Sequence, residues 1–592
     1  MVRPLRTGKD GFVQKENEQG LYGEGVKVAL VHVDIKWNDK EKNLAKLLAL
    51  NEKAAGAGAR IILNTELAAT GYAFESRADI APLTETIPGP TTGAFGQIAK
   101  KYGCYICIGL PEVAPETGIL YNAAALIGPA GRVLGRYRKV APAFRENLWA
   151  ARGNLPVLVV QTEFGNLGVV ICADAYSYKT ARVAALKGAR ILLVPANWPP
   201  EHHNPEKFWR ARAVENGIYV LACNRTGKDK TMNCHSAESF IIDTGGGALK
   251  QISSPDDIII YGTLPLECGK LILPEAEDIL GRRRPHYYGN ISLDTFSHFN
   301  PETLLNLPEP AEFTVATLQF RPASQDPATN TEKMLKLIDE ASAMATAKGM
   351  TLNLVILPEL STTGIIFERR EAEKWCEEIP GPATNIFTRK AEEEKIFIVL
   401  GMAERHAGRF YNSCVLIGPG GVEGRYRKVH LSRYDERWAQ AGNGGFSAFD
   451  LPFGRVGMLA GYDLMFPESV DSLAKWGTDL LCVPALWGDR KSKFIWEARM
   501  GEQMHMAVAN QWGSFGKFHA LGGSIIYSYS RYPEKRLKLE SPAEGDRVNI
   551  MRLSAKDARE KRFLENIDYD ILLHRNQEDR YIDSRGTKRT VP

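Results

Sequence analysis

Three residues of different chemistry, Glu66, Lys139 and Cys172, each stand where a predicted strand ends. Glu66 closes the run IILNTE, Lys139 follows RVLGRYR, and Cys172 ends VVIC and opens a turn. A free thiol titrates near pH ~8.5, so it needs a partner to form a thiolate at neutral pH. A carboxylate can accept its proton, and an ammonium can stabilise both the thiolate and an oxyanion. Together the three side chains could support nucleophilic attack on an amide or carbamoyl carbon.

The turn after Cys172 strengthens this interpretation. A nucleophile on a strand-to-helix turn is rigidly held, and the backbone N–H of the next residue, here Ala173, can face an oxyanion. Taken alone, a cysteine is far more often a small buried core residue, and a lysine or glutamate a solvated charge. The combination of the three residues, not any single one, therefore favours a catalytic site.

The elements that position these residues occur twice along the chain. GRYRKV occupies 135–140 and occurs again, unchanged, at 424–429. Gly168 in GNLGVVICAD corresponds to Gly457 in GRVGMLAGYD by the same offset of 289 positions (424 − 135 and 457 − 168). An internal repeat of this length indicates two duplicated domains.

Within each repeat, short apolar runs alternate with helical segments. ARIILNTEL, LGVVICAD and ARILLVPAN have the length and composition of buried strands, and SYKTARVAALKGA fits a helix between two of them. This alternation predicts an α/β fold with a largely buried sheet. The turn sequence GPAGR (128–132) adds an antiparallel hairpin.

The chain of 592 residues is too long for one ordinary core. The polar, proline-bearing stretch NPETLLNLPEPAE reads as a linker between the repeats. We therefore predict an N-terminal extension over 1–24, a catalytic domain over 25–299, a linker over 300–312 and a second domain with a C-terminal tail over 313–592.

Composition restricts the class of function. The hydrophobic fraction of 44% and the charged fraction of 24% are typical of a folded, soluble protein. The net charge of +4 is interspersed along the chain, which argues against a nucleic-acid partner. The N-terminus is polar and the apolar runs are only strand-length, so neither a secretory signal nor a membrane span is expected. The nine scattered cysteines fit a reducing cytoplasm, and we expect no metal and no other cofactor.

The strand-end glutamate, the RYRK lysine and the Cys-Ala-Asp turn, in this order and spacing, resemble the nitrilase superfamily of carbon–nitrogen hydrolases. The resemblance covers nearly all of both repeats. It implies that each repeat is a four-layer αββα sandwich. Because members of the superfamily usually dimerise, it also implies that the two repeats pack as an intrachain pseudo-dimer. Further homo-oligomerisation is left open.

The resemblance also assigns roles to residues of the first repeat. Glu66 corresponds to the general base, Lys139 to the oxyanion and leaving-group stabiliser, and Cys172 to the nucleophile. A second glutamate that orients lysine and substrate corresponds to Glu146. The predicted substrate-binding residues are the N–H of Ala173 and, by the resemblance, the pocket-lining pair Asn197 and Trp198.

The second repeat lacks the nucleophile. It retains Glu359 and Lys428, but Gly461 stands at the position of Cys172, and Asp435 at that of Glu146. Without a thiol or hydroxyl at this position the covalent mechanism cannot run. The resemblance therefore implies a pseudoenzyme domain in the C-terminal half.

We predict a hydrolase of non-peptide C–N bonds that acts on a small amide or N-carbamoyl substrate. A cysteine thioester would form, and ammonia or an amine would leave. The Cys-Ala-Asp turn differs from the Cys-Trp-Glu of true nitrilases, which favours an amidase or carbamoylase. Nitrile hydrolysis and acyl transfer by the same triad remain alternatives. A non-catalytic scaffold or binding protein is a further alternative, against which the intact Glu66, Lys139 and Cys172 argue.

Overall fold

The computed structural model describes residues 24–143, 145–200, 204–273, 279–297, 300–499, 503–532, 535–561 and 569–573. The predicted N-terminal extension, except for Glu24, and the last 19 positions of the predicted C-terminal tail (574–592) lie outside this part of the chain.

The first half contains two sheets that face each other. One has the strand order β13-β12-β1-β2-β3-β4-β5 and the other β11-β10-β9-β8-β7-β6. Strands β1, β2 and β3 run parallel, as do β7, β8 and β9. The strands of the first sheet are β1 (Glu24–His32), β2 (Ile61–Asn64), β3 (Tyr105–Val113), β4 (Leu120–Ile127), β5 (Val133–Arg138), β12 (Ile258–Glu267) and β13 (Lys270–Leu271). Those of the second are β6 (Leu158–Val160), β7 (Asn166–Val169), β8 (Ala189–Pro195), β9 (Tyr219–Cys223), β10 (Ser239–Ile242) and β11 (Ala248–Ile252).

Alternating side chains of the first sheet divide the core of this half into two layers. In β1, Val28 and Leu30 point between the two sheets, whereas Ala29 and Val31 pack with Phe95 under the outer helices. This is the period of two that a strand buried on both faces requires. The outer helices are α1 (Lys40–Gly56) and α3 (Pro90–Tyr102), and α4 (Tyr178–Leu186) and α5 (Glu206–Asn216) cover the second sheet. The predicted αββα sandwich is confirmed, and a short helix α2 (Arg77–Ile80) lies outside it.

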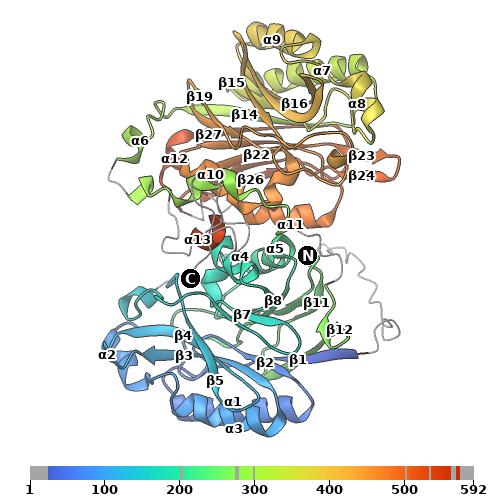
Figure 1. Cartoon of the computed structure of the whole chain (residues 1–592). Helices are drawn as coiled ribbons and strands as arrows, with labels where there is room; N and C mark the ends of the chain where they lie inside the picture. The colour runs from blue at the N-terminus through green and yellow to red at the C-terminus, as the bar shows by residue number, and fades with distance from the viewer. Residues whose placement is uncertain are drawn as a thin grey trace, which may run out of the picture.

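The second half repeats this architecture (Figure 1). Its sheets have the orders β18-β17-β16-β15-β14-β27 and β19-β20-β21-β22-β25-β26, and a hairpin, β23-β24, stands apart. The strands are β14 (Glu312–Gln319), β15 (Leu352–Ile356), β16 (Phe397–His406), β17 (Arg409–Gly418), β18 (Gly421–Arg427), β19 (Ala448–Leu451), β20 (Gly454–Met458), β21 (Leu480–Ala485), β22 (His505–Asn510), β23 (Trp512–Phe515), β24 (Phe518–Leu521), β25 (Ile525–Ser528), β26 (Leu537–Glu540) and β27 (Arg547–Ser554). The helices are α6 (Pro301–Leu304), α7 (Pro327–Ala347), α8 (Arg369–Trp375), α9 (Pro382–Glu394), α10 (Pro467–Lys475), α11 (Arg490–Arg499), α12 (Ala555–Arg559) and α13 (Tyr569–Leu573).

The two halves meet through their inner helices, so the tandem sandwiches form the predicted pseudo-dimer (Figure 1). Helix α5 packs along α11. The ends of the halves also cross over. Tyr288, from the end of the first half, donates to or accepts from His430 at 2.8 Å, and Leu572 of α13 packs into the core of the first half. These crossing segments tie each half to the other.

Buried ion pairs join α4 to α10 across this interface. Lys179 Nζ lies 3.1 Å from Asp471 Oδ2, and Arg182 Nε lies 3.1 Å from Glu468 Oε1. All four side chains are buried. By the repeat offset, Glu468 corresponds to Lys179 and Asp471 to Arg182. The same pair of positions is therefore cationic in the first half and anionic in the second.

This exchange of charge determines which halves can pair. In a twofold dimer of two first halves, Lys179 would face Arg182 of the other copy. In a dimer of two second halves, Glu468 would face Asp471. Like charges buried against each other are strongly unfavourable, whereas the pairing of unlike halves gives each of these four charges an opposite partner. The interface therefore favours the intrachain pairing over self-association of either half.

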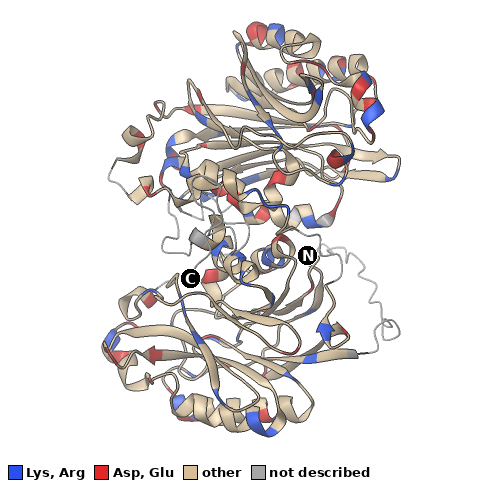
Figure 2. Cartoon of the chain, viewed as in Figure 1, with Lys and Arg blue, Asp and Glu red and all other residues tan. Residues whose placement is uncertain are grey.

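Elsewhere, acidic and basic residues are interspersed along the ribbon of both halves, as predicted from the sequence (Figure 2). Within the described residues, none of the helices combines the length and apolar character that a membrane span requires.

Candidate active site

The three predicted catalytic residues come from both sheets of the first half. Glu66 follows β2 and Lys139 follows β5, both of the first sheet. Cys172 begins a 3-10 turn, η3 (Cys172–Ala175), shortly after β7 of the second sheet. Gly109 of β3 makes room for Glu66, because a Cβ there would lie 2.8 Å from the Cα of Glu66. The site therefore lies where the ends of the two facing sheets meet.

Two carboxylates hold the lysine. Lys139 Nζ lies 2.6 Å from Glu66 Oε1 and 2.6 Å from Glu146 Oε1, and all three side chains are fully buried. Asn122 Nδ2 donates to the same Glu66 oxygen at 2.8 Å. The structure thus brings together Glu66, Lys139 and Glu146, which are separated by up to 80 positions in sequence (146 − 66).

Burial and these charges set the protonation states. Burial opposes the charge of Lys139, but the carboxylates of Glu146 and Glu66 outweigh it and raise the lysine pKa well above its ordinary value. Burial raises the pKa of Glu146 to about 7, against the opposing effect of Lys139. The ammonium is therefore permanent, while Glu146 titrates near neutral pH.

Cys172 has an unusual backbone conformation. Its φ of +45° lies in the left-handed region, which non-glycine residues rarely adopt and which occurs with strain at functional sites. The side chain is 5% exposed. Burial, and secondarily the charge of Glu66, raise the pKa of the thiol well above its ordinary value. In the free protein Cys172 is therefore a thiol, not a thiolate.

The predicted substrate-binding residues differ in their surroundings. The N–H of Ala173 makes no hydrogen bond within the described part of the chain, so it is available to a ligand. Asn197 instead contacts the glutamate: its backbone N–H donates to Glu66 Oε2 and its Nδ2 to the Glu66 carbonyl, each at 2.9 Å. The ring of Trp198 stacks on Phe208 with centroids 6.1 Å apart. Asn197 thus positions Glu66, and Trp198 packs among aromatic side chains.

Sequence reasoning missed two further residues that fix the site. Tyr72 lies under the lysine, with Lys139 Nζ 5.8 Å from its ring centroid, and its hydroxyl donates to the Ala143 carbonyl at 3.1 Å. Asp174 accepts from the Tyr137 hydroxyl and from the Ala141 N–H, each at 2.7 Å, and so ties the lysine segment to the cysteine turn. The repeat held a signal for Asp174, because the aspartate recurs as Asp463, but none for Tyr72.

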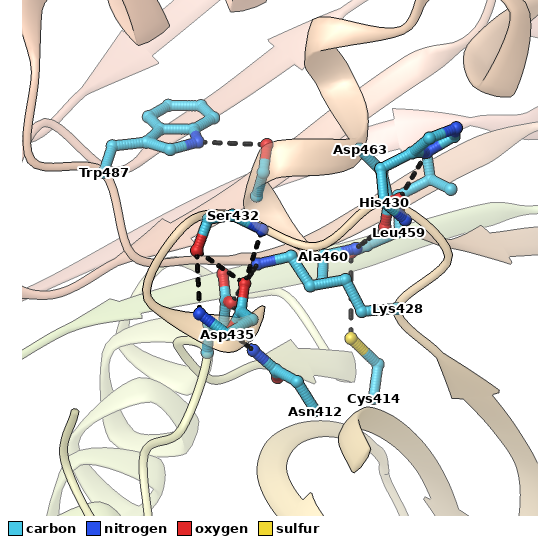
Figure 3. Close-up of polar contacts among 12 residues, drawn as sticks. Asn412, Cys414, Lys428, His430, Ser432, Asp435, Leu459, Ala460, Asp463 and Trp487 are labelled. Atoms are coloured by element: carbon cyan, nitrogen blue, oxygen red, sulfur yellow. Dashed lines mark hydrogen bonds and ion pairs between the residues drawn. The ribbon is translucent and has the colours of Figure 1, made fainter. Parts of the chain in front are cut away.

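The second half contains the same polar arrangement (Figure 3). Lys428 Nζ lies 2.6 Å from Glu359 Oε1 and 2.8 Å from Asp435 Oδ2. Asn412 Nδ2 donates to the same Glu359 oxygen at 2.6 Å and to Asp435 at 2.9 Å. Ser432 also binds Asp435 through its hydroxyl at 2.7 Å. Asp435 thus holds the lysine of the second half as Glu146 holds that of the first, with a side chain one methylene shorter.

The position of the predicted nucleophile differs between the halves. Gly461 has no side chain and, unlike Cys172, does not have a left-handed φ. The indole of Trp487 donates from Nε1 to the Gly461 carbonyl at 3.2 Å (Figure 3). A Cβ at position 461 would lie 2.9 Å from that Nε1 and 3.1 Å from Glu359 Oε2. The indole therefore occupies the space in which a nucleophilic side chain would begin.

No group of three or more His, Cys, Asp or Glu side chains that could hold a metal ion is found within the described ranges. The chemistry available at the first site is that of a thiol, an ammonium, two carboxylates and a backbone N–H.

Both halves match the family model described as carbon-nitrogen hydrolase, over residues 27–270 and 314–530. Among curated relatives, the chain is 30% identical over 270 residues to a probable nitrilase of Schizosaccharomyces pombe, an alignment that covers 44% of this chain and 96% of that protein. It is 31% identical over 255 residues to a citrullinase of Francisella tularensis, covering 40% and 88%. A nitrilase of Pyrococcus abyssi is 39% identical over 173 residues, which span 29% of this chain and 64% of that protein.

Solved structures give similar matches. A nitrilase-superfamily protein of Saccharomyces cerevisiae is 24% identical with a TM-score of 0.38, and covers 41% of this chain and 91% of its own. An amidase from Nesterenkonia sp. is 24% identical with a TM-score of 0.37, covering 42% and 93%. With two matched regions that together span most of its length, the chain belongs to the carbon-nitrogen hydrolase family, as a tandem duplication.

Proposed function

We propose that the first half hydrolyses the C–N bond of a small amide or N-carbamoyl compound through a thioester on Cys172, and that the second half does not catalyse. The observation that carries this proposal is the placement of Lys139 at 2.6 Å from both Glu66 and Glu146 in one buried site. A cysteine on a left-handed turn adjoins this site and is influenced by the charges of the same three residues.

The first step requires a base, because the resting cysteine is a thiol. Glu66 accepts the thiol proton as the sulfur forms a bond to the carbonyl carbon of the substrate. The C=O electron pair moves onto oxygen, and the Lys139 ammonium and the Ala173 N–H stabilise the resulting oxyanion. Two observations support these roles: two carboxylates hold Lys139, and the Ala173 N–H makes no hydrogen bond within the described residues.

The second step expels the nitrogen. The oxyanion electrons return to carbon, the C–N bond breaks, and the protonated Glu66 delivers its proton to the departing amine or ammonia. A water molecule, deprotonated by Glu66, then attacks the thioester, and the sulfur leaves as the thiol once it regains that proton. Glu146 keeps the lysine in register through the ion pair of 2.6 Å.

The names of the relatives support an amide or carbamoyl substrate without selecting one. They include a citrullinase, omega-amidases and an amidase as well as nitrilases. We favour amides and N-carbamoyl compounds over nitriles because the turn has the sequence Cys-Ala-Asp instead of the Cys-Trp-Glu of true nitrilases.

The purified chain is expected to release ammonia from primary amides or N-carbamoyl amino acids and not from the matching nitriles. The measurement is ammonia and carboxylate formation over a panel of the three compound classes at equal concentration. Added hydroxylamine should yield a hydroxamate from the amide substrate, because it intercepts the thioester. Ammonia from nitriles alone would contradict the assignment, and hydroxamate formation that far outpaces hydrolysis would favour an acyl transferase.

Moving the nucleophile to the second half should fail. In a Cys172→Ala, Gly461→Cys double variant we expect no turnover above that of Cys172→Ala alone. The new Cβ would lie 2.9 Å from the Trp487 indole, and the backbone lacks the left-handed turn of the first site. Steady-state ammonia release from both variants decides this. Recovery to within about tenfold of the wild-type rate would show that the second pocket is a complete site lacking only the thiol.

A further inference from the structure

We propose that the pocket of the second half is a binding site for a small, neutral primary amide, which it holds without hydrolysing. The proposal does not depend on the reaction assigned to Cys172. A cavity of about 240 Å³ opens over the buried lysine of this half. It is smaller than the ~300–1,000 Å³ typical of pockets for drug-sized ligands, so its occupant is a small molecule.

The floor of the cavity is polar. Glu359, Lys428 and Asp435 all line it. Lys428 donates to both carboxylates, and within the described residues no protein partner takes its third N–H. Oε1 of Glu359 accepts hydrogen bonds from Asn412 and Lys428. Its Oε2 has no hydrogen-bond partner among the described residues. The floor thus offers one donor and one acceptor side by side.

A primary amide matches this pair. Its carbonyl oxygen can accept from Lys428, and its NH₂ can donate to Glu359 Oε2. A carboxylate ligand would bring a third acidic group against Glu359 and Asp435, which is unfavourable although Arg433 and Lys517 also line the cavity. A cationic ligand would have to approach the buried ammonium. A neutral amide is the small polar group that satisfies both partners at no charge penalty.

At two positions the walls of this cavity are less polar than those of the first site. Ile365 stands at the position of Tyr72, and Leu486 at that of Asn197. Trp487 and Phe518 continue this apolar side of the cavity, and the rings of Phe518 and Tyr434 pack edge-on with centroids 5.3 Å apart. The rest of the cavity is lined by polar residues: Ser432, Arg433, Asp489, Ser492, Lys517 and His519. Two polar groups of the first site are therefore replaced by aliphatic ones. The ligand is a primary amide whose acyl group is short and apolar.

The Trp487 indole explains how such a ligand escapes hydrolysis. Its Nε1 donates a hydrogen bond to the Gly461 carbonyl, and the ring fills the space that a nucleophilic side chain would need. The polar floor nevertheless remains, although a buried ion triad contributes little to stability and well-packed apolar residues could replace it. A retained floor without a nucleophile is the arrangement expected of a binding site.

The test is photo-crosslinking of the full-length Cys172→Ala chain with a short primary amide that carries an alkyl diazirine. Labelled peptides are mapped by proteolysis and mass spectrometry. We expect label in the segments 359–366, 486–489 or 517–519, competed by isobutyramide and not by isobutyrate. Ile365→Trp, which fills the cavity, should reduce this label by about tenfold or more, as for loss of a buried contact. The matched control Leu304→Trp, at an exposed leucine outside the cavity, should leave it unchanged.

Label confined to the first half would overturn the proposal, as would second-half label that Ile365→Trp does not reduce. Competition by isobutyrate equal to that by isobutyramide would show that the site takes a carboxylate. If Ile365→Trp does not fold, Lys428→Met removes the donor without filling the cavity, and the same loss of label is expected. Because the label is mapped by position, these outcomes are separate from any result at the first site.

Discussion

Cys172→Ala is expected to lower turnover by on the order of 10⁴-fold or more, because it removes the only atom proposed to bond to the substrate. Its effect on stability should be small. The side chain loses a single sulfur atom, and alanine meets the same left-handed φ of +45° that the cysteine already tolerates. Steady-state ammonia release measures the loss, and the thermal unfolding midpoint checks the fold.

The matched control is Cys268→Ala, which removes an exposed thiol on the same half. It should retain wild-type turnover. Intact-mass spectrometry of the wild-type chain during turnover of a slow substrate should show one acyl adduct per chain, on the peptide that contains Cys172. A pure Cys172→Ala preparation with activity within about tenfold of wild type would rule out the thioester mechanism. A second adduct, on Cys414 or Cys482, would rule out a single working site.

Reversing one charge in the interface should destabilise the whole chain. Asp471→Lys replaces the partner of Lys179 with a second cation and also removes the acceptor of the Tyr178 hydroxyl. Breaking a buried ion pair typically costs about 3–5 kcal/mol, since it leaves an uncompensated buried charge. We expect the free energy of unfolding to fall by about this amount, measured by denaturant titration of the first unfolding transition.

The reciprocal variant Lys179→Asp, combined with Asp471→Lys, restores opposite charges and should recover most of the lost stability. Glu332→Lys is the control, because its pair with Lys336 is exposed (72% and 69%) and is worth only ~0–1 kcal/mol. Equal effects of Asp471→Lys and Glu332→Lys, or no rescue by the double variant, would show that this ion pair does not hold the halves together.

Much of the site could be predicted from the sequence, because its parts are local. The strand-end positions of Glu66, Lys139 and Cys172 follow from short apolar runs and the turns after them, which are read along the chain. The duplication is predicted by the recurrence of GRYRKV. The absence of a nucleophile in the second half is predicted by one residue, Gly461. Such features require no knowledge of what the residues touch.

The remaining features depend on contacts between distant residues. Tyr72 beneath Lys139 carries no local pattern, since any core aromatic looks the same in sequence. Trp487 recurs at the position of Trp198 (487 − 198 = 289), but the sequence does not show that its indole contacts Gly461. The contacts of Asn197 could not be predicted for the same reason: the resemblance implied only that it lines the pocket, and folding brings its amide and backbone N–H to Glu66.

The sequence by itself predicted the duplication and an α/β fold with a buried sheet, because strand period, strand ends and repeat spacing are properties of neighbouring residues. Its resemblance to the nitrilase superfamily implied the αββα halves and the roles of Glu66, Lys139 and Cys172. Only the tertiary structure decided how the halves join. Lys179 and Asp471 lie in helices that are almost half the chain apart, and neither helix indicates its partner. Their opposite charges acquire meaning when folding buries them within 3.1 Å of each other, where water no longer screens the interaction.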